Sequence, residues 1–181
     1  EINENLTNTI QDTNISAPNK KVGKVRDAYF LNDKVVMIST DRQSAFDRVL
    51  AAIPYKGAVL NSVSAWWFKK TEHLFPNHLI STPDPNVSIV EKCTVFPVEF
   101  VVRGYITGTT DTSLWTVYNN GDREYCGNSL PEGLKKNDKL DKPMLTPTTK
   151  DKIHDRPVSR EEIIDLGLMS AEDYDLAAKM S

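Results

Sequence analysis

Residues 22–39 read Val-Gly-Lys-Val-Arg-Asp-Ala-Tyr-Phe-Leu-Asn-Asp-Lys-Val-Val-Met-Ile-Ser, and this stretch decides the fold. Val22 to Phe30 predicts one strand, and the apolar run Val35 to Ser39 predicts a second, buried strand. Residues 31–34 between them predict a turn, because Asn and Asp side chains favour local bonds to the backbone. The stretch therefore predicts a β-hairpin, and ordered structure is expected from about Lys21 onward.

Downstream of the hairpin, residues 57–70 show the clearest helical pattern. Four large apolar residues recur there at three- and four-residue spacing, which places them on one face of the predicted helix. We expect this face to pack in the core; it consists of Val59, Val63, Trp66 and Trp67. Residues 87–90 and 93–105 predict two further strands, and Pro97 predicts an interruption or an edge in the second.

Helix-capping signals mark the last third of the chain. Residues 109–118 predict a loop and then a helix, which the Asn-Asn-Gly of 119–121 ends. Residues 122–158 predict a long, mostly irregular segment, a kind of segment that is often functional. A Ser-Arg-Glu-Glu capping box opens a predicted helix over 159–167, and a last helix is predicted over 170–180.

The composition restricts the class of protein. With 181 residues, 39% hydrophobic and 26% charged, the chain has the profile of a folded domain or two small lobes. No run approaches the roughly 18 apolar residues of a membrane span, and a net charge of −3 argues against a nucleic-acid partner. Cys93 and Cys126 are too few for a disulfide framework or a zinc site. We expect buried thiols and a cytoplasmic location, or a plastid location if the source is a plant.

The chain is expected to divide into three regions. Residues 1–20 predict a flexible polar tail, residues 21–98 a β-rich lobe, and residues 99–181 the start of a second α+β lobe. The sequence begins without a Met and ends inside the last predicted helix with no cap. We therefore expect a fragment of a longer protein, or a second chain that supplies the remainder; a homo-oligomer is the other assembly that the sequence leaves open.

Four short segments combine residue types that bind anions. In Gly23-Lys24-Val25-Arg26-Asp27, the glycine allows a backbone to approach a ligand closely, and alternation along a strand would point Lys24 and Arg26 to one face. Two cations beside a glycine suit a polyphosphate. The alternative is a solvated basic strand edge, since the segment matches neither a Walker A motif nor G-x-G-x-x-G.

The second and third segments each follow a predicted strand. Residues 40–47 offer both signs of charge and the hydroxyl of Ser44; the alternative is a turn with capping residues. Residues 101–110 end an apolar strand with Arg103, whose planar fork suits a phosphate, and the glycines and threonines after it would complete an anion site. The alternative there is an ion pair between Arg103 and Glu99 on the same strand face.

The fourth segment, residues 145–155, places three hydroxyls together with Lys150, His154 and Asp155 in a long predicted loop. The alternative is an exposed linker. The remaining histidines, His73 and His78, are interpreted as surface residues.

Together these segments resemble the SAICAR synthetase (phosphoribosylaminoimidazole-succinocarboxamide synthase) family of de novo purine biosynthesis, and most of all its plant-type branch. The resemblance covers essentially all of residues 21–180, in the same order and at close to the same spacing. It rests on GKVRD at 23–27, TDRQSAFDRVLAAIPYKGAVLN at 40–61, FPVEFVVRGYITGTT at 96–110 and LTPTTK at 145–150, with WW, SLW and HD as shorter matches. No single motif is decisive, but the joint match is specific.

The resemblance implies an ATP-dependent ligase. Members of the family join L-aspartate to CAIR, a carboxylated aminoimidazole ribonucleotide, and give SAICAR, ADP and phosphate through an acyl phosphate, with Mg²⁺ bridging the phosphates. Phosphorylation supplies a leaving group that a carboxylate lacks, so the protein mainly positions reactants and neutralises charge. The implied fold is α+β, with a kinase-like antiparallel N-terminal lobe and part of an ATP-grasp-like second lobe.

The resemblance also implies roles for individual residues. Those implied to bind ATP are Gly23, Lys24, Val25 and Arg26 over the phosphates and Val98, Glu99 and Phe100 at the adenine. Those implied to bind the other substrates are Ser44, Asp47, Arg103, Thr109 and His154. Those implied to be catalytic are Asp47, Lys150 and Asp155, of which the last two belong to a loop that closes over the aspartate side. Thr109 stands where many members have Ser, which keeps the hydroxyl.

The metal site is expected outside this sequence. No segment matches the acidic pattern D-x-K-x-E-F-G that holds Mg²⁺ in the family, so the resemblance places those carboxylates C-terminal to Ser181. The leading interpretation is the N-terminal portion of the ligase, and the alternative is a truncated module that binds ATP or a ribonucleotide without turnover. A kinase-like phosphotransferase is disfavoured, because no H-R-D-x-x-x-x-N or D-F-G segment occurs.

Overall fold

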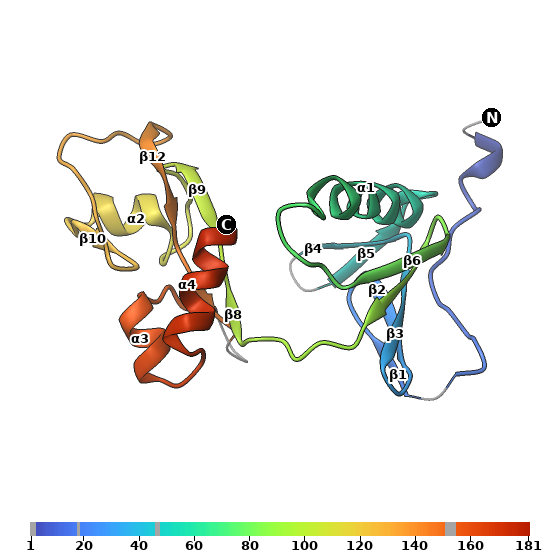
Figure 1. Cartoon of the computed structure of the whole chain (residues 1–181). Coiled ribbons are helices and arrows are strands. Elements are labelled where there is room, and N and C mark those ends of the chain that lie inside the picture. Colours follow the sequence, from blue (N-terminus) through green and yellow to red (C-terminus); the bar gives the residue numbers. More distant parts are fainter. Residues whose placement is uncertain (1–2, 18, 46–47, 151–154) are drawn as a thin grey trace. The chain divides into compact units, whose positions relative to one another are not determined.

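A computed structural model describes residues 3–17, 19–45, 48–150 and 155–181 (Figure 1). Internal contacts divide the chain into two compact units, Glu1–Thr94 and Val95–Ser181. Both units combine helices with antiparallel sheets, which is an α+β arrangement. Within the described ranges, no helix is both long enough and apolar enough to cross a membrane.

The first unit is built on a five-stranded antiparallel sheet in the order β1-β2-β3-β7-β6. Its strands are β1 Lys20–Val22, β2 Arg26–Phe30, β3 Lys34–Ser39, β6 Leu79–Asp84 and β7 Val87–Glu91. The predicted hairpin is confirmed as the pair β2–β3, whose register joins Arg26 to Ser39 and Phe30 to Val35. A separate two-stranded ribbon follows β3 and consists of β4 Arg42–Ala45 and β5 Arg48–Ala52. A short 3₁₀ turn, η1, covers Asn3–Asn5 near the N-terminus.

The helix α1, Lys56–Thr71, is one residue longer at each end than predicted and packs with a different face. Gly57 and Asn61 are its buried residues, and a Cβ on Gly57 would lie 2.2 Å from the Ser39 carbonyl oxygen. The helix therefore approaches the sheet more closely than any other residue type would allow. Asn61 accepts a hydrogen bond from the buried Ser88 hydroxyl at 2.7 Å, so a polar contact joins α1 to β7.

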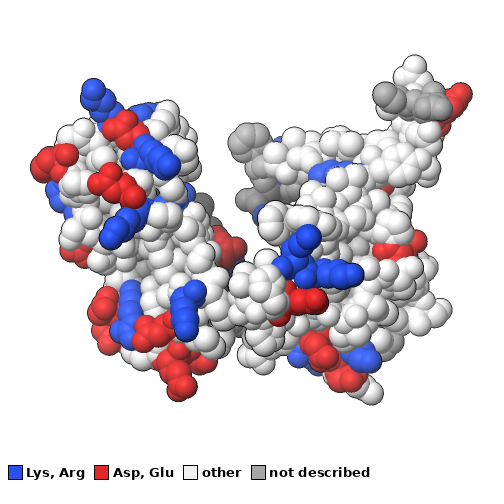
Figure 2. Space-filling view, turned by 45° about the horizontal axis from the view of Figure 1, so that its top comes forward, with Lys and Arg blue, Asp and Glu red and all other residues white. Residues whose placement is uncertain are grey.

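The prediction that this face of α1 packs in the core is wrong. Val59, Val63, Trp66 and Trp67 are all at least half exposed, and the two indole rings contact each other edge to face at 4.8 Å. In Figure 2, most of the visible surface of this unit is uncharged, with Lys, Arg, Asp and Glu side chains scattered over it. Because Gly57 must lie against the sheet, its face of α1 packs inward. The face with the larger apolar residues is therefore exposed.

The N-terminal segment and α1 belong to opposite faces of the sheet. Asp27 and Tyr29 of β2 lie across from Ile38 and Val36 of β3, and so they share one face. Thr13 hydrogen-bonds to both Asp27 and Tyr29 on that face, and the N-terminal segment runs past that side in Figure 1. The residues of the other face alternate with these and pack toward α1. Residues predicted as a tail thus have specific contacts with the sheet.

Among its described residues, the second unit forms three short antiparallel pairs, β8–β13, β9–β12 and β10–β11. Their bounds are β8 Val98–Glu99, β9 Val102–Tyr105, β10 Glu124–Tyr125, β11 Asn128–Ser129, β12 Lys139–Leu145 and β13 Thr148–Thr149. The predicted strand over 93–105 is wrong in part: residues 93–97 are not in a strand, and β8 and β9 follow Pro97, where an interruption was predicted. The predicted irregular stretch 122–158 is also wrong in part, because four of these strands lie within it.

The helices of the second unit are α2 Leu114–Asn119, α3 Arg160–Asp165 and α4 Ala171–Met180. The predicted capping box is confirmed: the Ser159 side chain accepts from the Glu162 amide, and Glu162 accepts from the Ser159 amide. Ser170 caps α4 in the same way through the amide of Asp173. Two apolar clusters form the core of this unit, one around Ile106 and Leu114 and one around Val158 and Ile163.

Candidate functional site

Residues 23–25 form the turn between β1 and β2, and this differs from the predicted continuous strand. The amide of Gly23 donates to the carbonyl of Arg26 at 2.7 Å, which closes the turn. A Cβ at position 23 would lie 2.9 Å from that same carbonyl oxygen, so the turn favours glycine. Lys24 thus lies at the tip of a hairpin rather than on a strand. The prediction that strand alternation points Lys24 and Arg26 to one face is therefore wrong.

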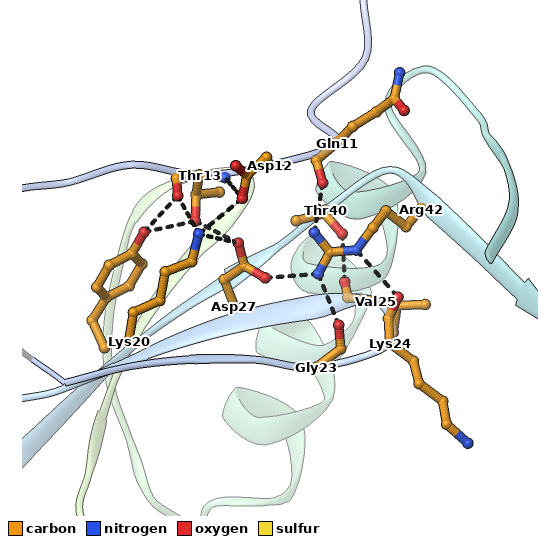
Figure 3. A network of polar contacts seen from close by, with 11 residues as sticks. Gln11, Asp12, Thr13, Lys20, Gly23, Lys24, Val25, Asp27, Thr40 and Arg42 are labelled. Carbon is orange, nitrogen blue, oxygen red and sulfur yellow. Dashed lines mark hydrogen bonds and ion pairs between the residues drawn. The ribbon is translucent and has the colours of Figure 1, made fainter. Parts of the chain in front are cut away.

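Arg42, at the start of β4, binds the backbone of this turn from one side (Figure 3). Its Nη2 donates to the Gly23 carbonyl at 3.0 Å, and its Nε donates to the Lys24 carbonyl at 3.2 Å. The Thr40 amide and hydroxyl both donate to the Val25 carbonyl, at 3.0 and 2.9 Å. Three successive carbonyl groups of the turn are therefore held on one side.

The direction of these carbonyls determines which way the turn presents its amides. In a planar trans peptide the N–H points opposite to the C=O. Because the carbonyls of Gly23 and Lys24 point to Arg42, the amides of Lys24 and Val25 point to the opposite side of the turn. The Lys24 side chain also extends away from Arg42 in Figure 3. Amides and a lysine that face the same way are a suitable arrangement for a phosphate group.

Asp27 binds the same guanidinium of Arg42 that holds the turn. Its side chain is wholly buried, and its carboxylate accepts from Arg42 Nη2 at 2.7 Å and from the Thr13 hydroxyl at 2.6 Å. Lys20 lies 3.2 Å from the same carboxylate. Burial alone would raise the pKa of Asp27, but the bonds from Arg42, Thr13 and Lys20 outweigh it and hold the pKa below its ordinary value.

A cavity of about 270 Å³ opens beside the turn, between the sheet and α1. Val25 and Arg26 line it where the turn ends, and Met37, Ser39, Phe68 and His78 are among the other lining residues. His78 differs from the surface position that the sequence predicts: it is half-buried, with its ring 5.1 Å from that of Phe68. Burial and the nearby Arg26 guanidinium lower the pKa of His78, so its ring is neutral near pH 7.

In the second unit, Glu99, Lys150 and Asp155 lie together. Lys150 Nζ is 2.5 Å from the Glu99 carboxylate and 3.5 Å from that of Asp155. The contact with Glu99 is the main cause that raises the pKa of Lys150, so this amine stays protonated at neutral pH. Neighbouring Val98 and Phe100 pack against the core of α3 and α4, where the Phe100 ring is 5.2 Å from that of Tyr174.

Arg103 on β9 does not pair with Glu99, which excludes the alternative considered for it. Its Nε donates to the Thr146 hydroxyl at 3.0 Å, and that hydroxyl donates to the Val101 carbonyl at 3.0 Å. Within the described ranges, the two terminal nitrogens of Arg103 have no hydrogen-bond partner. The side chain is therefore oriented by Thr146 with the end of its fork available to an anion.

The structure groups the predicted site residues by unit. Gly23, Lys24, Val25 and Arg26 lie at the turn, and the half-buried Ser44 lies on β4 opposite Val49. Val98, Glu99, Phe100, Arg103, Lys150 and Asp155 lie in the second unit, where Thr109 is exposed in the loop before α2. Asp47 and His154 lie outside the described residues.

Sequence reasoning missed Asp27, Arg42 and Thr13 as site residues. Asp27 and Arg42 both lie inside motifs quoted above. The available signal was the carboxylate of Asp27 in a strand with apolar neighbours, because a buried carboxylate needs a buried partner. In the part of the chain that the structure describes, no group of three or more His, Cys, Asp or Glu residues lies close enough to hold a metal ion.

Comparison with known proteins decides the family. The model of the SAICAR synthetase family matches residues 19–181. This chain belongs to the SAICAR synthetase family. A phosphoribosylaminoimidazole-succinocarboxamide synthase of Legionella pneumophila (strain Lens) is 60% identical over 166 residues, which cover 92% of this chain and 53% of the relative. The chloroplastic enzyme of Arabidopsis thaliana is 56% identical, in a match that covers 98% of this chain and 44% of the relative.

Solved structures confirm the family's α+β fold for this chain. The SAICAR synthase of Saccharomyces cerevisiae in complex with SAICAR matches with a TM-score of 0.77 at 28% identity, over 94% of this chain and 64% of that one. A type-2 SAICAR synthetase in complex with ADP matches with a TM-score of 0.69 at 23% identity, over 90% and 63%. The chain spans about half the length of the curated relatives it matches, and the resemblance to the plant-type branch is confirmed by the plant relatives.

Proposed function

We propose that the protein that contains this chain is an ATP-dependent ligase that joins L-aspartate to CAIR and gives SAICAR, ADP and phosphate. The observation that carries the proposal is the family match over 19–181 together with the turn at 23–25. Arg42 and Thr40 hold the carbonyls of the turn inward, so its amides and Lys24 face a phosphate group on the other side. A family relative bound to ADP supports the choice of nucleotide.

The proposed reaction has two steps. A carboxylate oxygen of CAIR attacks the γ-phosphorus of ATP, and the bond from that phosphorus to ADP breaks. The aspartate amine then attacks the acyl carbon, the C–O bond to phosphate breaks, and the amine loses a proton as the amide forms. The protein contributes position and charge in both steps, because the attack needs the two anionic substrates held close together.

Roles for the residues are those that the family resemblance implies. In the first unit, the turn would cover the ATP phosphates, with Ser44 and Asp47 toward CAIR. In the second, Val98, Glu99 and Phe100 would contact the adenine, and Arg103 and Thr109 would bind the CAIR phosphate. Lys150, His154 and Asp155 would act on the aspartate side. Mg²⁺, when bound, would neutralise charge on the phosphates; the described residues offer no carboxylate cluster to hold it.

The test is a turnover assay with the full-length protein, ATP, L-aspartate and CAIR labelled with oxygen-18 in its carboxylate. We expect SAICAR and ADP in equal amounts, and one labelled oxygen in the released phosphate for each turnover. SAICAR formation without label in the phosphate would contradict the acyl-phosphate route while leaving the ligase activity in place. Nucleotide binding without any SAICAR would support the alternative, a non-catalytic binding module.

A further inference from the structure

Arg42 connects the N-terminal segment to the turn at 23–25. Its Nη1 donates to the Gln11 carbonyl at 2.5 Å, while Nε and Nη2 reach the carbonyls of Lys24 and Gly23. Arg42 is only 8% exposed, and its planar guanidinium cannot adjust one bond without moving the others. The position of the turn is therefore tied to the position of the backbone at Gln11.

Residues 9–13, here called the strap, are themselves attached to the first unit at both ends. At one end the Ile10 amide donates to the Asp41 carboxylate at 2.8 Å, and the Asp41 amide donates back to the Ile10 carbonyl at 2.8 Å. At the other end the Thr13 hydroxyl donates to Asp27 at 2.6 Å and lies 2.8 Å from the Tyr29 hydroxyl. Figure 3 shows Gln11 and Thr13 on the side of Arg42 away from the turn.

Removing the strap would change the environment of two buried charges. Arg42 would lose the Gln11 carbonyl and Asp27 would lose the Thr13 hydroxyl, so water would have to replace both. A guanidinium solvated on that side has more freedom to rotate, and the Gly23 and Lys24 carbonyls lose a fixed donor. The amides of the turn would then point in a range of directions instead of one.

We propose that the strap and Arg42 position the turn at 23–25 for nucleotide binding, so that the N-terminal segment is part of the ATP site without touching the nucleotide. The proposal rests on the proposed function of the turn. Arg42 and Thr13 are positioning residues, because each acts through the backbone of the turn or through Asp27. Loss of the strap contacts should weaken nucleotide binding while the sheet stays folded.

The test uses the full-length protein and the variant Thr13→Val, which removes the hydroxyl and keeps the side-chain shape. The matched control is Thr7→Val, an exposed position in the same segment. The dissociation constant for ADP is measured by calorimetry, and amide hydrogen exchange is followed over residues 23–26 and over β3. We expect Thr13→Val to weaken ADP binding about five- to tenfold and to speed exchange at 23–26 only. Thr7→Val should change neither the dissociation constant for ADP nor the exchange rate at 23–26.

Two further variants distinguish a failure of the strap proposal from a failure of the proposed function. Arg42→Lys keeps a charge beside Asp27 but loses the planar fork, so it should raise the KM for ATP with little change in the KM for CAIR or in kcat. Lys24→Ala tests the proposed function of the turn itself. If Lys24→Ala weakens ADP binding and Thr13→Val and Arg42→Lys do not, the strap proposal is overturned and the proposed function stands.

Three other results also count against the strap. Faster exchange over the whole sheet in Thr13→Val would mean that the hydroxyl supports general stability, which overturns the positioning role. An equal loss of ADP affinity in Thr7→Val would do the same. If the wild-type protein binds no nucleotide, the proposed function fails and the strap proposal fails with it.

Discussion

Arg42 and Asp27 form a buried ion pair, with 2.7 Å between Nη2 and Oδ1, and the same Arg42 binds the carbonyls of the turn at 23–25. Asp27 is the only carboxylate among the described residues that contacts Arg42. Breaking a buried pair by removing one partner is costly, because the other charge stays buried. The pair therefore links the stability of the first unit to the geometry of its candidate nucleotide site.

The first prediction concerns pH. The folded pKa of Asp27 lies below the value of about 3.9 for an unfolded Asp, so its contribution to stability is complete above about pH 4 and is lost as the pH falls through the folded pKa. Asp27→Asn should lower the free energy of unfolding by roughly 2–4 kcal/mol at pH 7 and by less at pH 3. Urea unfolding of both proteins between pH 3 and pH 7 measures this difference in the free energy of unfolding. Asp33→Asn, in an exposed turn, is the control; a loss for Asp27→Asn that does not change with pH would contradict the argument.

The second prediction concerns Lys24. Its side chain points away from Arg42 and the buried network in Figure 3, so its removal leaves the bonds that Arg42 donates to the Gly23 and Lys24 carbonyls in place. Lys24→Ala should raise the KM for ATP about tenfold or more and leave the KM for CAIR within about twofold. Steady-state kinetics with each substrate varied in turn measures both. An unchanged KM for ATP would remove Lys24 from the phosphate site.

The third prediction concerns Arg103, whose fork is oriented by Thr146. Arg103→Ala should raise the KM for CAIR far more than the KM for ATP, because the guanidinium is proposed to bind the ribonucleotide phosphate. Thr146→Val should have a smaller effect of the same kind, since it removes the orienting hydroxyl and keeps the charge. Equal changes in both KM values would refute the assignment of Arg103.

The fourth prediction concerns the capping box of α3. Ser159→Ala should lower the free energy of unfolding by about 1 kcal/mol, because it leaves the Glu162 amide without its acceptor. Ser113 occupies the same N-cap position of α2 but its side chain makes no capping bond. Ser113→Ala is therefore a matched control and should cost less. Thermal unfolding followed by circular dichroism compares the two variants, and equal losses would argue against the cap as the cause.

The fifth prediction concerns the two thiols. Cys93 is exposed, contrary to the expectation of two buried thiols, whereas burial raises the pKa of Cys126 to about 11. At about pH 8 the Cys126 thiolate is scarce, so a maleimide should label Cys93 first and Cys126 much more slowly. Mass spectrometry of the labelled protein identifies the site. Equal labelling rates in the folded protein would show that Cys126 is accessible.

Features that depend on neighbours in the chain were predictable. The β2–β3 hairpin, the bounds of α1 and the capping box at Ser159 follow from short-range periodicity and from side-chain bonds to nearby backbone. Family membership was also predictable, because the order and spacing of several motifs survive in the linear sequence. The exposed face of α1 was not, since the requirement for a close approach at Gly57 appears only when the Ser39 carbonyl lies beside it.

By itself the sequence determined the family, the α+β class and the principal elements, because local patterns and motif order carry that information. The tertiary structure alone decided that Gly23 to Val25 form a turn, that residues 9–13 reach the sheet, and that Asp27 meets Arg42, fifteen residues away. Contacts of this kind depend on the register of the strands and on which buried polar groups find one another, and neither can be read from residues that are adjacent in sequence.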